Sequence, residues 1–401
     1  MHAQPGSGIR IGESLLMTPE LSASYNWNNN VSLRSRALEN GNENEQGKQS
    51  DSYTAGQVSL SLRHWNRSSQ TLARGWYNIE NYKKFDDLSE PSYGGSLSWF
   101  WARPGAETTI KSDFSQQIAV DKTEQIIGAL DDSFQTQELE SIADRVQREE
   151  TKAKVTVDQE LIKDVRSDFT YSYSAFNYDD ERYNDRVNQI ASIEANYQFT
   201  PKTQPYLRLG YGWDEDEGFA GIAEKPFFLT GARFNPSDKL RIDAAGGYET
   251  YTRTPTAGLD AGNELHDAGI KWSLSVKYIA THKTRFSLNG RNGYNSVASE
   301  GSSSRRENSV SLALDHQTTR QFNQRLSVSW REDDYLSLIP SSGGTYDELK
   351  ETWMFQYSID YQTVRPWLRL FAKARYEDGS SRIPGDSYTQ AEVTVGLKAQ
   401  Y

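Results

Sequence analysis

Apolar and polar side chains alternate one by one along most of this chain. The final stretch shows the pattern clearly: every second position from 389 to 401 is Thr, Ala, Val, Val, Leu, Ala or Tyr, and the positions between them are Gln, Glu, Thr, Gly, Lys and Gln. A strand directs successive side chains to opposite faces, so this stretch has one apolar face and one polar, charged face. We therefore predict strands that separate an apolar environment from water.

The same two-residue period returns in about eighteen segments of roughly nine or more residues, the length that a tilted strand needs to cross a bilayer. Short polar turns, such as 280–283 and 363–366, alternate with long polar connections, such as 36–51. This organisation predicts an all-β fold: a single transmembrane antiparallel β-barrel of about 18 strands, with short periplasmic turns and long extracellular loops. Residues 1–15 are expected to be a flexible lead-in, and residues 16–401 the barrel.

One segment, residues 120–150, breaks the strand rhythm. Leu139, Ile142 and Val146 are spaced at helical intervals with charged residues between them, which predicts a surface helix over 138–150 inside the longest loop. Such a loop either folds inward and narrows the pore, or caps the surface and binds a partner. The sequence leaves both open.

The composition is polar, with 36% hydrophobic residues and a mean hydropathy of −0.78. No apolar run approaches the ~18 residues of a membrane-spanning helix, whereas a barrel strand shows lipid only half of its side chains. The 23 Tyr and 10 Trp suit aromatic girdles at the membrane interfaces, and they also suit a sugar-binding protein. The absence of Cys excludes disulfides, a thiolate metal site and a cysteine nucleophile.

The net charge of −11 and the pI of about 5.2 speak against nucleic acid as a partner, because no basic stretch supplies phosphate contacts. The start, Met-His-Ala-Gln-Pro-Gly, is interpreted as the mature end of an exported protein whose signal peptide has been removed. The expected location is the bacterial outer membrane, and the expected surroundings are the lipid bilayer and lipopolysaccharide.

The polar face of the predicted strands carries charges of both signs. About eighteen strands enclose a lumen wide enough for water, so these side chains predict either a hydrated conduit or cross-strand ion pairs that fix the barrel wall. The candidate lumen-lining residues are Lys111, Asp113, Lys154, Glu194, Arg208, Arg241, Asp243, Lys271, Arg285, Arg291, Arg325, Arg331, Asp360, Arg369, Lys373, Arg375 and Glu392.

Large aromatic residues lie near the ends of several predicted strands, where a girdle at headgroup depth is expected. The candidate girdle residues are Trp99, Trp101, Trp213, Trp330, Trp353 and Tyr401. A path for sugars would instead need aromatic residues on the polar face, for which Phe100, Tyr206 and Phe371 are the candidates.

We predict no enzyme, no cofactor and no metal site. The five His residues are scattered, and none has the spacing of a metal or nucleophile motif. His266 and His316 each adjoin an Asp, but adjacent residues of a strand point to opposite faces. The acidic run 214–218 offers hard oxygen ligands for Ca²⁺, although its spacing does not match an EF-hand and a solvated loop is the simpler reading.

The first predicted strand carries Pro19, Leu21 and Tyr25 and is followed by Asn29, Asn30 and Val31. This run resembles the opening of the Putative beta-barrel porin 2 family. The resemblance implies an outer-membrane barrel that serves as an exit pore for exopolysaccharide. Asn28 stands where the family element usually has Asp, which counts against a metal or turn role for that position.

Three functions remain open. The first is a channel for a hydrophilic polymer that works with periplasmic export machinery, and the family resemblance names exopolysaccharide as that polymer. The second is a general or solute-selective diffusion porin for small polar molecules. The third is a scaffold or receptor whose long loops bind a partner.

Overall fold

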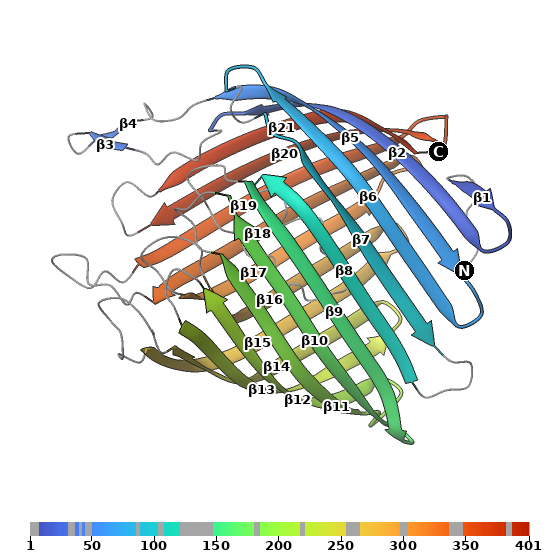
Figure 1. Ribbon diagram of the computed structural model, residues 1–401, viewed down its shortest axis with the longest axis vertical. Coiled ribbons are helices and arrows are strands. Elements are labelled where there is room, and N and C mark those ends of the chain that lie inside the picture. Colours follow the sequence, from blue (N-terminus) through green and yellow to red (C-terminus); the bar gives the residue numbers. More distant parts are fainter. Residues whose placement is uncertain are drawn as a thin grey trace.

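The computed structural model describes residues 8–30, 37–39, 42–44, 50–85, 89–102, 108–120, 147–179, 185–216, 221–253, 265–296, 304–336, 348–381 and 387–400. These residues form a barrel of long, tilted strands (Figure 1). The wall strands are β2 (Leu15–Asn28), β5 (Asp51–Trp65), β6 (Ser69–Tyr82), β7 (Ser92–Ala102), β8 (Thr108–Val120), β9 (Gln147–Ile162), β10 (Val165–Tyr178), β11 (Arg186–Tyr197), β12 (Thr203–Asp216), β13 (Gly221–Ser237), β14 (Leu240–Arg253), β15 (Leu265–Thr281), β16 (Thr284–Ser296), β17 (Ser304–Gln317), β18 (Phe322–Leu336), β19 (Glu348–Gln362), β20 (Leu368–Ser381) and β21 (Tyr388–Gln400).

Three short strands stand apart from this wall. β1 (Ile9–Ile11) pairs with the first residues of β2, and β3 (Ala37–Glu39) pairs with β4 (Asn42–Asn44) as a separate two-stranded sheet. They add nothing to the ring itself.

The wall closes on itself. Each strand from β5 onward pairs antiparallel with its neighbours in the sequence, and β2 pairs with both β5 and β21. The 19-stranded sheet is therefore a closed ring of 18 strands with β1 as one extra strand. This confirms the predicted transmembrane-type antiparallel barrel, and closure leaves no free sheet edge in the membrane.

The two rims differ in the length of their connections. Wall strands are joined by two to five residues at one rim and mostly by longer segments at the other, of which the longest separates β8 from β9. β1 and the end of β21 lie at the rim with the short turns (Figure 1). By the rule for outer-membrane barrels, that rim faces the periplasm.

The outer surface of the wall is apolar. Leu288 and Val328 are the direct cross-strand neighbours of Leu312, which is 49% exposed. An apolar belt of this kind is stable only against lipid. Other exposed apolar side chains of the belt are Leu21, Val58, Leu97, Leu209, Ile270, Phe355 and Leu397.

The Asn-Asn element after the first strand completes the ring closure. Backbone N–H and C=O groups join Asn29 to Ala391 of β21, and the Asn29 side chain accepts a further bond of 2.6 Å from the Ala391 N–H. Asn30 is fully buried and donates from Nδ2 to the Thr389 carbonyl at 3.0 Å. These amides therefore extend the β2–β21 pairing past the end of β2.

Several sequence expectations are revised at their boundaries. β9 begins at Gln147, so the predicted helix over 138–150 cannot include its last four positions, and residues 121–146 of the 120–150 segment lie outside the described residues. Asn235 and Pro236 lie in β13, whose last residue is Ser237. Within the ranges described above, no helix is long and apolar enough to span a bilayer.

Candidate functional site

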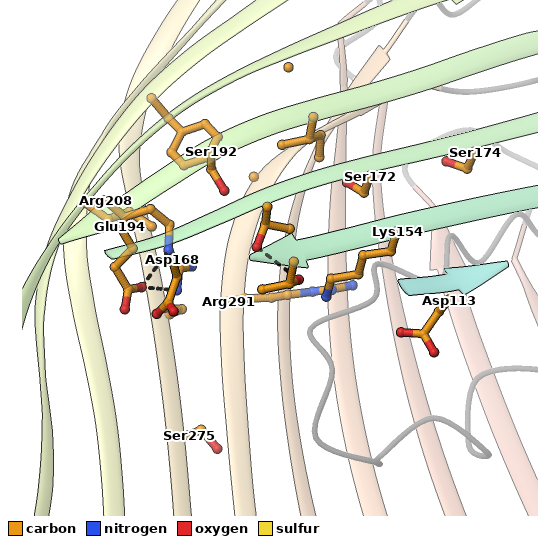
Figure 2. A pocket seen from close by; sticks show the side chains of 18 of the residues that line it. Asp113, Lys154, Asp168, Ser172, Ser174, Ser192, Glu194, Arg208, Ser275 and Arg291 are labelled. Carbon is orange, nitrogen blue, oxygen red and sulfur yellow. Dashed lines mark hydrogen bonds and ion pairs between the residues drawn. The ribbon is translucent and has the colours of Figure 1, made fainter. Parts of the chain in front are cut away.

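The lumen contains a cavity of about 1110 Å³ along the inner face of β7 to β17. Its wall combines charged side chains with many Ser and Thr hydroxyl groups, and Figure 2 shows several of them pointing into the open space. In β13 the inward positions are the odd-numbered ones, so Phe227 and Leu229 line the cavity while Phe228 is exposed on the outside. The even-numbered positions around Phe228 therefore face outward.

Nine of the candidate lumen-lining residues lie on the wall of this cavity: Lys111, Asp113, Lys154, Glu194, Arg208, Arg241, Asp243, Lys271 and Arg291. The others, Arg285, Arg325, Arg331, Asp360, Arg369, Lys373, Arg375 and Glu392, lie on wall strands outside it. Among these, Arg331, Arg375 and Glu392 are buried, and Glu392 accepts a bond of 2.9 Å from the Tyr53 hydroxyl. Their participation in transport stays a prediction.

Glu194 of β11 is the centre of an ion-pair network in the cavity. Its two carboxylate oxygens each contact one guanidinium at 2.6 Å, from Arg208 of β12 and Arg233 of β13. Arg233 also contacts Asp243 of β14 at 3.3 Å, and Asp243 accepts a bond of 2.7 Å from the Tyr206 hydroxyl. Glu194 is only 3% exposed, and its two carboxylate oxygens link the two arginines across β11, β12 and β13.

Replacing Glu194 by Gln is expected to shift the ion selectivity of the lumen towards anions, because two guanidinium groups lose their shared negative partner. The reversal potential in a KCl gradient across a planar bilayer measures this shift. Asp238→Asn removes the same charge from an exposed periplasmic turn and serves as the control. Equal reversal potentials for the two variants would contradict the prediction.

Burial of the lumen face increases from the periplasmic to the extracellular end. In β14, Arg241 is exposed and Asp243 is half-buried, whereas Glu249, Tyr251 and Arg253 are 4%, 0% and 1% exposed. Side chains facing an open, water-filled lumen would be exposed throughout. The extracellular half of the lumen is therefore closely packed, and the periplasmic half is open.

Charged side chains dominate this packed half. Six of them, all 7% exposed or less, come from β17, β18 and β20: Arg305, Glu307, Arg331, Asp333, Arg375 and Glu377. Asp333 contacts Arg331 at 2.9 Å and Arg305 at 3.5 Å, and Arg375 pairs with Glu377. Buried charges need such partners, so these pairs stabilise a constricted mouth.

Strands β15 and β16 separate in the extracellular half of the wall. Pairing of the two strands ends at Ser273 and Arg291, although β15 begins at Leu265 and β16 continues to Ser296. The carboxamide of Asn292 takes over the missing backbone bonds: its Oδ1 accepts from the Trp272 N–H at 2.7 Å and its Nδ2 donates to the Ile270 carbonyl at 2.6 Å. One side chain thus covers the free edge of β15.

Beyond Asn292, the end of β16 lies on the lumen side of β15. The Tyr294 backbone N–H donates to Glu249 of β14 at 3.3 Å, and its carbonyl accepts from Lys225 of β13 at 3.4 Å. The Tyr294 ring packs on Tyr251 of β14, with ring centroids 5.5 Å apart. Because the end of β16 bonds to side chains of β14 and β13, it must pass over the lumen face of the intervening strand β15.

The overlap is tightly fitted. The Arg306 guanidinium of β17 donates to the Ile270 carbonyl at 3.3 Å, and a Cβ added to Gly269 would lie 2.6 Å from its Nη2 atom. The flexible end of Arg306 would have to move to make room for any larger side chain at position 269. We call residues 292–296 of β16 the inward segment, and it narrows the extracellular mouth.

Sequence reasoning missed Asn292, Tyr294 and Lys225. A signal was present, because Asn292 occupies the outward phase of β16 set by Phe286 and Leu288. A polar residue in that phase breaks the alternation and marks a place where the strand leaves the lipid-facing wall.

The candidate girdle residues face the apolar side of their strands. Trp330 and Trp353 are cross-strand partners, and Trp213 packs against Tyr211 and Tyr171. Trp99 and Trp101 lie near the periplasmic end of β7, whereas Tyr401 lies outside the described residues. Their anchoring role stays a prediction.

The first three residues of the acidic run 214–218 belong to β12 and not to the loop expected from the sequence, and residues 217 and 218 lie outside the described residues. Asp214 lies in β12, is 2% exposed and pairs with Lys225. The part of the chain that the structure describes contains no group of three His, Cys, Asp or Glu residues able to hold a metal ion. His266 and His316 contact threonine hydroxyl groups at 3.1 and 2.9 Å.

A closed barrel with an apolar belt and a charged lumen defines an outer-membrane channel of the porin type. The family model "Putative beta-barrel porin 2" matches residues 4–401, so the chain belongs to that family, and its place is the bacterial outer membrane. This confirms the resemblance seen at the first strand. No curated protein matches the chain.

Solved structures share the fold at very low identity. The FrpB iron transporter from Neisseria meningitidis has 8% identity and a TM-score of 0.50, over 98% of this chain and 83% of that one. OpdK from Pseudomonas aeruginosa has 10% identity and a TM-score of 0.48, over 96% and 99% of the two chains. A BenF-like porin from Pseudomonas fluorescens Pf-5 has 10% identity and a TM-score of 0.49, over 96% and 99%. The likeness to FrpB shows a shared barrel fold and says nothing about function.

Proposed function

We propose that this porin is a diffusion channel for small polar solutes. The carrying observation is the packed extracellular half of the lumen, where buried ion pairs and the inward segment of β16 occupy the interior. A small hydrated solute needs only a narrow path through such a mouth. A polysaccharide must thread an unobstructed path along the whole lumen, so the packed half gives no support to the polymer-export hypothesis drawn from the family resemblance.

The mixed charge of the wall suits this function. Ion pairs such as Lys271 with Glu249, 2.5 Å apart, and Arg291 with Glu307, 3.2 Å apart, hold most charged groups in place. A solute then meets a polar surface to which it binds weakly at each position, which allows it both to enter and to leave. Neither a cofactor nor periplasmic export machinery is required for this passive process.

Liposomes containing the purified chain are expected to swell in isotonic mono- and disaccharide solutions and to stay unchanged in large dextrans. A gradual loss of swelling with solute size measures the diameter of the mouth. Passage of dextrans at a rate close to that of disaccharides would overturn the small-solute function in favour of polymer passage.

A deletion strain gives a second readout of the same proposal. Slower uptake of small polar solutes with unchanged surface polysaccharide is the expected result. Loss of surface polysaccharide with normal solute uptake would reverse the conclusion.

A further inference from the structure

Most basic side chains on the cavity wall are neutralised by a carboxylate within ion-pair distance. This holds for Lys152, Arg208, Lys225, Arg233, Lys271 and Arg291. Lys111 and Lys154 also line the cavity, but among the described residues no carboxylate oxygen lies within 4.0 Å of either ammonium group. These two lysines carry charge that the wall leaves available.

The register places the two lysines side by side. Lys154 of β9 lies opposite Asp113 of β8, and Lys111 lies opposite Thr156, so the lysines are diagonal neighbours on one face. Diagonal neighbours have Cα atoms about 7–8 Å apart, and two long flexible side chains easily bring their ammonium groups to one ligand from that distance. Lys154 is half-buried, whereas Lys111 is exposed to the cavity.

Hydroxyl groups flank the pair on both sides. Ser98 of β7 lies opposite Asp113, and Ser172 of β10 lies opposite Lys154. Figure 2 shows Lys154, Asp113 and Ser172 on neighbouring strands, with the Lys154 and Asp113 side chains extending into the cavity. Both serines line the same cavity and offer hydrogen-bond donors of the kind that complete an oxyanion site.

The charge balance favours an anion. Two ammonium groups face a single carboxylate, Asp113, so the group has one excess positive charge inside a partly desolvated cavity. Charge interactions are stronger there than in bulk water, and an ammonium without a partner is most stable when an anion joins it.

We propose that Lys111 and Lys154, with the Ser98 and Ser172 hydroxyl groups, form a binding site for small oxyanions, namely solutes that carry a carboxylate or phosphate group. This inference rests on the proposed channel function and names the class of solute that the channel favours. Asp113 opposes binding and keeps it weak, so that the solute is released again.

The test measures inorganic phosphate binding to single channels of the full-length chain in planar bilayers, as the phosphate concentration that halves the chloride current. Lys111→Gln and Lys154→Gln are each expected to raise that concentration about tenfold, the loss that one charge-assisted hydrogen bond produces. Asp113→Asn is expected to lower it. A purely structural role for these residues would not give effects of opposite sign.

Lys398→Gln is the matched control, because Lys398 pairs with Glu20 at 2.9 Å on β21, outside the cavity. In this variant the phosphate concentration that halves the current is expected to stay within about twofold of the wild-type value. Twofold corresponds to roughly 0.4 kcal/mol, because a tenfold change is about 1.4 kcal/mol. Unchanged binding in the double variant Lys111→Gln/Lys154→Gln, or an equal loss in Lys398→Gln, overturns the site. If the wild-type chain shows no conductance, the proposed channel function is wrong. Calorimetric titration of the detergent-solubilised chain with phosphate then tests the binding site independently of the channel function.

Discussion

Replacing Asn292 by Ala is expected to raise the single-channel conductance and to admit larger solutes in the swelling assay. Asn292 makes two short bonds to the free edge of β15, to the Trp272 N–H and the Ile270 carbonyl. The variant loses both bonds and leaves the Trp272 N–H without its partner, at a cost of about 1–3 kcal/mol, whereas the Ile270 carbonyl keeps its bond from Arg306. The inward segment then keeps the bond from the Tyr294 hydroxyl to Asp267 of β15 but loses both bonds at its base, so it holds the mouth narrow less firmly.

The control variant for this experiment lies on the same strand. Asn289→Ala removes a single 2.9 Å bond from the Ser275 hydroxyl, at a position where the β15–β16 pairing is intact. We expect its conductance to match that of the wild type. If Asn292→Ala and Asn289→Ala behave alike, the inward segment does not set the width of the mouth.

The second large effect concerns the outer surface. Leu312→Arg is expected to destabilise the folded barrel by about 2–4 kcal/mol, the cost of placing an arginine on the lipid-facing side near the bilayer midplane. Leu312 is 49% exposed and lies among apolar cross-strand neighbours, Leu288 and Val328. Unfolding from phospholipid bilayers in guanidinium chloride measures the change in free energy.

The adjacent residue provides a sharp comparison. Ser311 occupies the opposite face of β17, between Asn289 and Ser329, so Ser311→Arg places the same side chain in the aqueous lumen. We expect little loss of stability from it and a change in conductance instead. Equal destabilisation by the two arginines would mean that this face of β17 does not meet lipid.

The alternation of side chains was enough to predict the barrel, because lipid and water impose a period of two on every strand. It also placed residues such as Glu194 and Arg208 on one face. It did not predict their pairing, since contact between neighbouring strands depends on register, which loop lengths and bulges set. The Asn29–Asn30 element illustrates the same limit: the sequence marked it as distinctive, and only its contacts with Thr389 and Ala391 reveal that it helps to close the ring.

The sequence by itself therefore determined that this chain is a closed membrane wall with an apolar outside and a charged inside. Two-residue periodicity is a local property, and every strand carries it independently of the others. Tertiary structure alone decided how wide the passage is. The bonds of Tyr294 to Glu249 and Lys225 join residues 45 and 69 positions apart, and no local pattern encodes contacts over such separations.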